Sequence, residues 1–277
     1  MWVACGQGTN SLAYSYDGRT WTGLGTSIFS TNAIAVAWNG TRWVAVGYGT
    51  NTIAYSSDGI NWTAVANSTS IFSTGGTCIA WNGTQWVAGG EGTANSIATS
   101  SDGITWTGRG KSVFDSYARG VVWIGDKWVM GGAGTSFRIA TSTDGITWTG
   151  QSSSFTSQCI GLAWNGSILV GVGYGGATIA TSTNGTAWTS RGSSIFTTYG
   201  LGVCWNGVRF IGVGQGTNTI ATSKDGITWY AVPSNTNIFD TAGISATSNP
   251  KVGATIVASK LSLNQGQSLV VVTPPYY

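Results

Sequence analysis

The 277-residue sequence contains no histidine, a single glutamate (Glu91) and only 8 % charged residues. Without histidine it cannot form a Ser-His-Asp or Cys-His nucleophile system, an imidazole general base or a histidine-containing zinc site. A single glutamate leaves little room for a hydrolase that uses paired carboxylates. We therefore predict a protein that is not an enzyme, with no catalytic residues, no metal site and no cofactor.

Long apolar runs and a strong net charge are also missing. No apolar run reaches the roughly 18 residues that a membrane-spanning helix requires. The net charge is +3, with scattered lysines and arginines, which is too small for the electrostatic footprint of a nucleic-acid binder. The first residues, Met1–Gly6, lack the basic and apolar regions of a signal peptide. We expect neither a membrane span nor a nucleic-acid partner.

Glycine and tryptophan are abundant instead, with 43 and 15 copies, and the tryptophans reveal an internal repeat. One mark, Ser-x-Asp-Gly-x-x-Trp, recurs at intervals of 40 to 44 residues. Two further marks, Ala-Trp-Asn-Gly and Trp-Val-x-x-Gly, contain the remaining tryptophans, with Ile168 and Phe210 assigned to the tryptophan position in the later copies. A phenylalanine such as Phe29 follows each copy, and we expect it to pack between neighbouring copies. The four cysteines occupy different places in the repeat, which predicts small buried thiols.

Each copy has the pattern of four short strands. In the second copy these are Ile34–Trp38, Arg42–Val46, Thr52–Tyr55 and Asn61–Val65. Asn39-Gly40 is predicted to form a tight two-residue hairpin turn, because both residue types tolerate positive φ angles. No stretch shows a sustained 3.6-residue apolar period, so helix should be nearly absent.

Four-stranded units of this length are typical of a β-propeller. We predict an all-β, six-bladed β-propeller of four-stranded antiparallel blades over residues 1–250, with seven blades as the weaker alternative. The N- and C-terminal strands should close the ring, with Ala242–Asn249 completing the first blade beside Trp2. Residues 251–277 lie outside the repeat as a C-terminal tail, in which Leu261–Leu263 and Ser268–Val272 suggest a short hairpin.

Segments such as Ser15–Trp21 and Ser142–Trp148 resemble the Asp-box, or BNR repeat, of sialidase-type propellers, with one residue fewer between aspartate and glycine. In that family the box caps the hairpin of the outer two strands, its aspartate accepts backbone N–H bonds and its aromatic residue packs beneath. Turn chemistry favours the same structural role, because the asparagine in the fifth copy can accept the same bonds. The residues assigned to this role are Asp17, Asp58, Asp102, Asp144, Asn184, Asp225, Trp21, Trp62, Trp106, Trp148, Trp188 and Trp229.

The complete repeat, including Trp-Asn-Gly-Thr-x-Trp-Val-Ala-x-Gly and the later Ser-Ile-Phe-Ser-Thr, resembles uncharacterised propeller-repeat proteins of giant DNA viruses. The resemblance covers about residues 1 to 245. It implies a propeller and brings no assigned activity. Together with a surface rich in Ser, Thr, Asn and Gly, it favours a virion-borne or extracellular protein.

The strongest candidate for a binding site is the variable residue between paired glycines after the second strand. In a propeller these loops share one face with the connections between blades, so the variable residues would ring the mouth of the channel. The candidate ligand-binding residues are Gln7, Tyr48, Glu91, Tyr174 and Gln215, with Ala133 at the same place in the fourth copy.

These observations favour a non-enzymatic binding or assembly module with a protein or glycan partner, associated with a virion or contacting a host. A glycan-binding lectin that uses Tyr48, Tyr174, Gln7 and Gln215 is an alternative. A sialidase-like glycoside hydrolase is the weakest alternative, because it needs three arginines, an acidic proton donor and a tyrosine with a glutamate partner. Only Glu91 could supply that partner.

Overall fold

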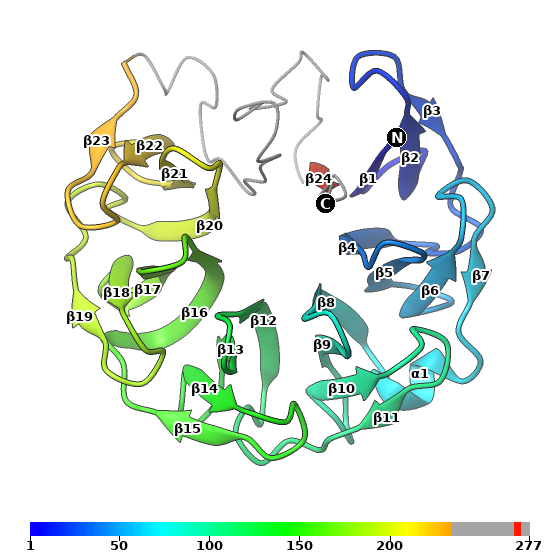
Figure 1. Ribbon diagram of the computed structural model, residues 1–277, viewed down its shortest axis with the longest axis horizontal. Helices are drawn as coiled ribbons and strands as arrows, with labels where there is room; N and C mark the ends of the chain where they lie inside the picture. Colours follow the sequence, from blue (N-terminus) through cyan, green and yellow to red (C-terminus); the bar gives the residue numbers. More distant parts are fainter. Residues whose placement is uncertain (234–268, 273–277) are drawn as a thin grey trace. The chain divides into compact units, whose positions relative to one another are not determined.

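The computed structural model of the chain describes residues 1–233 and 269–272. The regular secondary structure of the described residues consists of antiparallel strands and one short helix. The strands follow the predicted repeat, and in each repeat consecutive strands pair with one another (Figure 1). The chain forms two compact bodies, one with Met1–Lys111, Ser116–Ala118 and β24 (Leu269–Val272), the other with Ser112–Asp115 and the strands that follow Arg119.

The first body contains repeats 1 to 3, each with four antiparallel strands. Repeat 1 consists of β24, β1 (Trp2–Gly6), β2 (Leu12–Ser15) and β3 (Thr22–Gly23). Repeat 2 consists of β4 (Asn32–Trp38), β5 (Trp43–Tyr48), β6 (Ile53–Ser56) and β7 (Thr63–Ala64). Repeat 3 consists of β8 (Gly75–Trp81), β9 (Trp86–Glu91), β10 (Ile97–Ser100) and β11 (Thr107–Gly108).

Repeats 4 to 6 continue the same pattern. Repeat 4, whose first strand begins in the first body, consists of β12 (Tyr117–Trp123), β13 (Trp128–Ala133), β14 (Ile139–Ser142) and β15 (Thr149–Gln151). Repeat 5 consists of β16 (Phe155–Trp164), β17 (Leu169–Gly176), β18 (Ile179–Ser182) and β19 (Thr189–Ser190). Repeat 6 consists of β20 (Tyr199–Trp205), β21 (Phe210–Gln215), β22 (Ile220–Ser223) and β23 (Tyr230–Ala231).

The strand that completes repeat 1 differs from the predicted one. β24 pairs antiparallel with β1, with Val3 opposite Val272 and Gly6 opposite Leu269 (Figure 1). The prediction placed Ala242–Asn249 at this edge, and that segment lies outside the described residues, as does Leu261–Leu263 of the predicted hairpin. A strand from the tail takes the edge because Leu-Val-Val-Val has a stronger β propensity than the Gly- and Ser-containing segment.

The turn between the first two strands also differs in detail from its prediction. Trp38 lies opposite Trp43, and Gly40 has the positive φ of +101° that the turn requires. Asn39 instead accepts the N–H groups of Thr41 and Arg42 on its Oδ1, at 2.9 and 2.7 Å. The central pair of the turn is therefore Gly40-Thr41, and the asparagine closes it through its side chain.

A short helix, α1 (Ser68–Ile71), was not predicted. It lies in the linker between repeats 2 and 3, where Phe72 follows Trp62 by ten residues. In the first copy Phe29 follows Trp21 by eight residues. The two additional residues give this linker enough length for one helical turn, which a periodicity search over a longer window does not detect.

Large aromatic side chains form the core of each repeat. Trp43, Trp86 and Trp128 are fully buried, as are the linker phenylalanines Phe29 and Phe72. Phe29 shares one cluster with Val3 of repeat 1 and Trp43 of repeat 2, so it joins neighbouring repeats. In repeat 5 the residue opposite Trp164 is Leu169 and not the predicted Ile168. Leu169 is fully buried, whereas Ile168 is half-buried.

The glycines of four Ser-x-Asp-Gly turns, Gly59, Gly103, Gly185 and Gly226, pack against the second strand of the preceding repeat. At Gly103 an added Cβ would lie 2.9 Å from Val44 Cγ2 and 3.1 Å from Trp86 Nε1, and φ is +75°. Gly59 and Gly226 approach Val3 and Val170 in the same way, each at 2.9 Å. This position thus needs glycine both for its backbone conformation and for its contact.

The variant Gly103→Ala should lower the free energy of unfolding more than Gly110→Ala does. Gly110 has the same φ of +75°, but a Cβ added there would meet nothing within 4 Å. A left-handed alanine costs about 1–2 kcal/mol at either site, and overpacking at residue 103 should add about 1–3 kcal/mol. Urea denaturation of both variants measures the difference, and equal losses would contradict the packing argument.

Candidate functional site

The Ser-x-Asp-Gly turns share one hydrogen-bond arrangement. In repeat 4, Asp144 Oδ1 accepts the N–H groups of Ile146 and Thr147, both at 2.8 Å. Ser142 Oγ donates to Asp144 and accepts the N–H of Gly145, again at 2.8 Å. The same contacts recur at Asp17, Asp58, Asp102 and Asp225.

Asn184 provides an internal comparison in repeat 5. Its Oδ1 accepts the N–H groups of Thr186 and Ala187, both at 3.0 Å, and Gly185 donates to Ser182 Oγ at 2.8 Å. An amide oxygen therefore makes the same turn contacts as a carboxylate oxygen.

The turn contacts also lower the pKa of the aspartates. The N–H groups of Thr147 and Ile146 hold the pKa of Asp144 at about 2, and those of Thr20 and Arg19 do the same for Asp17. At Asp102 partial burial raises the pKa, but the turn N–H groups outweigh it and the pKa is again about 2. The N–H of Ile60 and that of Thr228 lower the pKa of Asp58 and Asp225. These groups are ionised at neutral pH and are poorly suited to donate a proton.

Four of the tryptophans that follow these turns are anchored to them. Their indole Nε1 donates to the carbonyl oxygen of the turn glycine at 2.9 to 3.1 Å. Trp106 is buried without such a bond. The anchored residues are Trp62, Trp148, Trp188 and Trp229.

The predicted binding residues lie at the ends of second strands, not in the loops that follow. Tyr48, Glu91 and Gln215 are the last residues of β5, β9 and β21, and Gln7 directly follows β1. We call this set, which also contains Ala133 and Tyr174, the strand-end positions. Because β6 is antiparallel to β5, the strand-end position and the Asp58 turn lie at opposite ends of β6.

In the first body two strand-end positions come together. The Tyr48 ring lies against Gly75, where an added Cβ would be 2.3 Å from a ring carbon. Its hydroxyl donates to Glu91 Oε2 at 3.4 Å. Single backbone bridges join Tyr48 to Gly75 and Glu91 to Tyr117, and another joins Gln7 to Asn32. Residues from consecutive repeats thus form one half-buried patch.

A second patch of the same kind lies in the other body. The rings of Tyr174 and Tyr199 are edge-to-face, with centroids 4.8 Å apart and an interplanar angle of 88°. Gln158 donates its side-chain N–H to the Tyr174 hydroxyl. Tyr199 lies opposite Gln215 across β20 and β21.

The cross-strand neighbours of the strand-end positions were not predicted. Each of them lies six residues before the tryptophan of the Trp-Asn-Gly mark, and the residue type changes from copy to copy. That constant offset with variable chemistry is the signal that would have found them. The missed residues are Asn32, Gly75, Tyr117, Gln158 and Tyr199.

The hydrogen bonds of several arginines stabilise the fold. Arg42 Nη1 donates to the backbone oxygen of Asp102, and Arg138 Nε donates to Thr156 O at 3.0 Å. Arg109 and Arg191 donate to threonine hydroxyls on neighbouring strands at 2.8 and 2.9 Å. The Tyr48–Glu91 contact matches the tyrosine–glutamate pair of the sialidase-like arrangement. The four arginines, by contrast, form hydrogen bonds with backbone and threonine oxygens of strands and turns.

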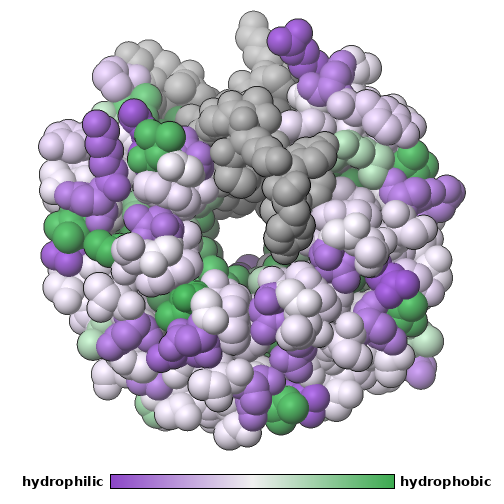
Figure 2. Space-filling view, viewed as in Figure 1, coloured by the Kyte–Doolittle hydropathy of each residue, from purple (hydrophilic) through white to green (hydrophobic). Residues whose placement is uncertain are grey.

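All four cysteines are buried thiols, and burial raises the pKa of Cys159. On the face in view, hydrophobic residues are scattered among weakly polar ones (Figure 2). Among the described residues, no helix has the length and apolar character to cross a membrane.

No protein-family model and no curated protein sequence matches the chain. Solved structures do. A GH74 enzyme from Niastella koreensis is 19% identical, with a TM-score of 0.55 over 74% of this chain, and the GH74 xyloglucanase from Xanthomonas campestris is 19% identical, with a TM-score of 0.59 over 81%. These matched structures are β-propeller proteins. The chain has the β-propeller fold.

In a third match, the aligned region includes nearly the whole of the matched chain. It comes from a nidogen/laminin complex, is 12% identical and has a TM-score of 0.60, covering 88% of this propeller and 96% of the matched chain. By contrast, the propeller spans about a third of the two GH74 enzymes, 32% and 36%.

The GH74 matches correct one prediction. The chain was predicted not to be an enzyme, and two structural matches that are enzymes contradict this. The prediction relied on missing residue types, above all histidine and paired glutamates. The β-propeller fold also occurs in glycoside hydrolases, so the fold gives no support to that prediction.

The stability of the propeller should depend on pH through the turn aspartates. The pKa values of Asp17, Asp102 and Asp144 are lowered to about 2 in the folded state, and those of Asp58 and Asp225 are lowered as well, against about 3.9 in an unfolded chain. The unfolded chain therefore binds protons first as the pH falls. The free energy of unfolding should be constant above about pH 5 and decrease as the pH falls from about 4 to about 2.

Urea denaturation across this pH range measures the effect, with Asp144→Asn as the matched variant. It keeps the turn contacts seen at Asn184 and removes one titrating group, so its stability should decrease less in acid. An unchanged acid dependence in this variant would show that Asp144 does not contribute.

Proposed function

We propose that this propeller, assembled as six blades, is a binding module that holds a protein partner on its strand-end positions. One observation carries the proposal: Tyr48, Gly75 and Glu91, which come from different strands of two repeats, form a single contact patch. The glycine leaves room for the tyrosine ring, and the ring reaches the one glutamate of the chain.

In each repeat the turn at one end of the third strand is constant and the residue near the other end varies, and this difference supports the proposal. At one end the Ser-x-Asp-Gly turns repeat the same hydrogen bonds from copy to copy. At the other end the strand-end residue is glutamine, tyrosine, glutamate or alanine. Variable side chains on a rigid frame are the usual design of a recognition surface.

The chemistry of the patches fits a protein partner. Tyrosine is enriched in protein interfaces, because it contributes a large rigid ring together with a hydroxyl that can hydrogen-bond. Tyr48, Tyr117, Tyr174 and Tyr199 are all half-buried, so each is held by the fold and still reaches the surface. The matched nidogen/laminin structure is a protein complex, which accords with this use of the fold.

The test compares three forms of the immobilised chain: wild type, Tyr48→Ala/Tyr174→Ala and the control Tyr16→Ala. Tyr16 is 72% exposed and lies beside the Asp17 turn, at the other end of the sheet from the strand-end positions. Proteins from the native source that bind the wild type should be retained by Tyr16→Ala and lost, by at least about tenfold, from the double variant. Equal retention by all three forms would contradict the proposal.

A further inference from the structure

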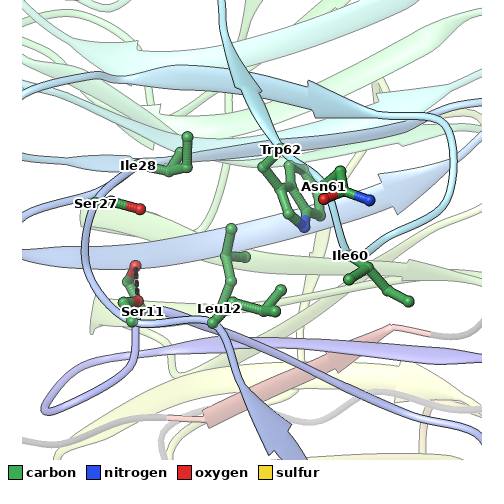
Figure 3. Close-up of a pocket in the computed structure, with 9 residues that line it drawn as sticks. Ser11, Leu12, Ser27, Ile28, Ile60, Asn61 and Trp62 are labelled. Atoms are coloured by element: carbon green, nitrogen blue, oxygen red, sulfur yellow. Dashed lines mark hydrogen bonds between the residues drawn. The ribbon is translucent and has the colours of Figure 1, made fainter.

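A small cavity lies in the first body and is lined by residues of repeats 1 and 2. Its volume is about 190 Å³. Leu12, Leu24, Ile28 and Trp62 form its apolar walls. Figure 3 shows Leu12, Ile28 and Trp62 around one space, with the Ser27 hydroxyl directed toward it.

The groups that border the cavity are held in place. Trp62 Nε1 donates to Gly59 O at 3.1 Å, which fixes the plane of the indole. Asn61 donates its side-chain N–H to Asp58 Oδ2 at 2.7 Å and its backbone N–H to Asp58 Oδ1 at 2.8 Å. One turn therefore orients both the aromatic wall and the amide at the rim, so the site is preorganised.

The corresponding side chains between repeats 2 and 3 are more deeply buried. There Val65, Ile53 and Trp106 form one packed cluster, and Trp106 is only 8% exposed. The longer linker forms α1, and Ser68 at its start is bound by Thr52, whose Oγ1 donates to Ser68 O at 2.7 Å. In repeat 1 the shorter linker places no helix at this position. The linker beside the cavity therefore differs from the linker that follows repeat 2.

The chemistry of the lining selects one class of ligand. Among the described residues no charged side chain lines the cavity, and its polar groups are the hydroxyls of Ser11 and Ser27 and the amide of Asn61. A pyranose ring has an apolar C–H face that stacks on an indole, and its hydroxyls exchange hydrogen bonds with serine and asparagine. The volume is below the 300–1,000 Å³ of pockets for drug-sized ligands and suits one ring.

We propose that this cavity binds one uncharged pyranose unit of a glycan, with the sugar ring stacked on Trp62 and its hydroxyls facing Ser27 and Asn61. The site shares no residue with the proposed protein-binding positions, because none of the strand-end residues lines the cavity. Either proposal can fail without the other.

Saturation-transfer NMR of the full chain tests the proposal with the methyl glycosides of glucose, galactose, mannose and N-acetylglucosamine, and with N-acetyl-leucine amide as an apolar probe. At least one glycoside should give a saturation signal. Ser27→Phe places a ring in the cavity from an exposed position and should weaken that binding at least tenfold. The matched control Ser70→Phe, at the equivalent exposed position before Ile71, should bind as the wild type does.

A second variant covers the case in which Ser27→Phe does not fold. Trp62→Phe keeps an aromatic wall but shrinks it, and should weaken sugar binding at least threefold. The proposal is overturned if no glycoside binds, if only the leucine probe binds, or if the folded cavity variants bind sugar as strongly as the control does.

Discussion

The close contact between a turn glycine and the preceding repeat is the constraint on which the rest of the structure depends. It is seen at Gly59 and Gly103 in the first body and at Gly185 and Gly226 in the second. The neighbouring aspartate accepts two turn N–H groups, and the serine two residues before it binds the glycine N–H. These bonds hold the glycine at a positive φ, and the missing side chain lets two repeats approach at van der Waals distance.

This arrangement lets the two ends of a repeat serve different purposes. The turn end is fixed by hydrogen bonds that allow little change beyond the exchange of aspartate for asparagine at residue 184. The strand-end positions do not take part in those turn contacts, so their side chains can vary while the frame stays the same. A chain with only 8% charged residues can therefore offer distinct surface chemistry through tyrosine, glutamine and one glutamate.

Much of the fold could be predicted because the recurring residues of the repeat have clear structural roles. Tryptophan spacing and the Asp-Gly turns were enough to place the strands. The features that were not predicted correctly depend on local details of the chain. β24 pairs with β1 through backbone bonds that leave no repeat signature, and α1 depends on two additional linker residues. Leu169 was missed because Ile168 is equally apolar, and only the pairing register shows which one faces Trp164. The partners of the strand-end positions follow from strand pairing, and the cavity at Trp62 follows from the packing of side chains from two repeats, which the sequence alone does not show.

The central claim is that the turn glycines hold the frame while the strand-end positions are free to vary. Saturation mutagenesis, with resistance to proteolysis as the measure of folding, tests it most directly. We expect most substitutions at Gln7, Ala133 and Gln215 to leave a protease-resistant chain, and nearly all substitutions at Gly59, Gly103 and Gly226 to abolish it. Equal tolerance at the two sets of positions would contradict the account.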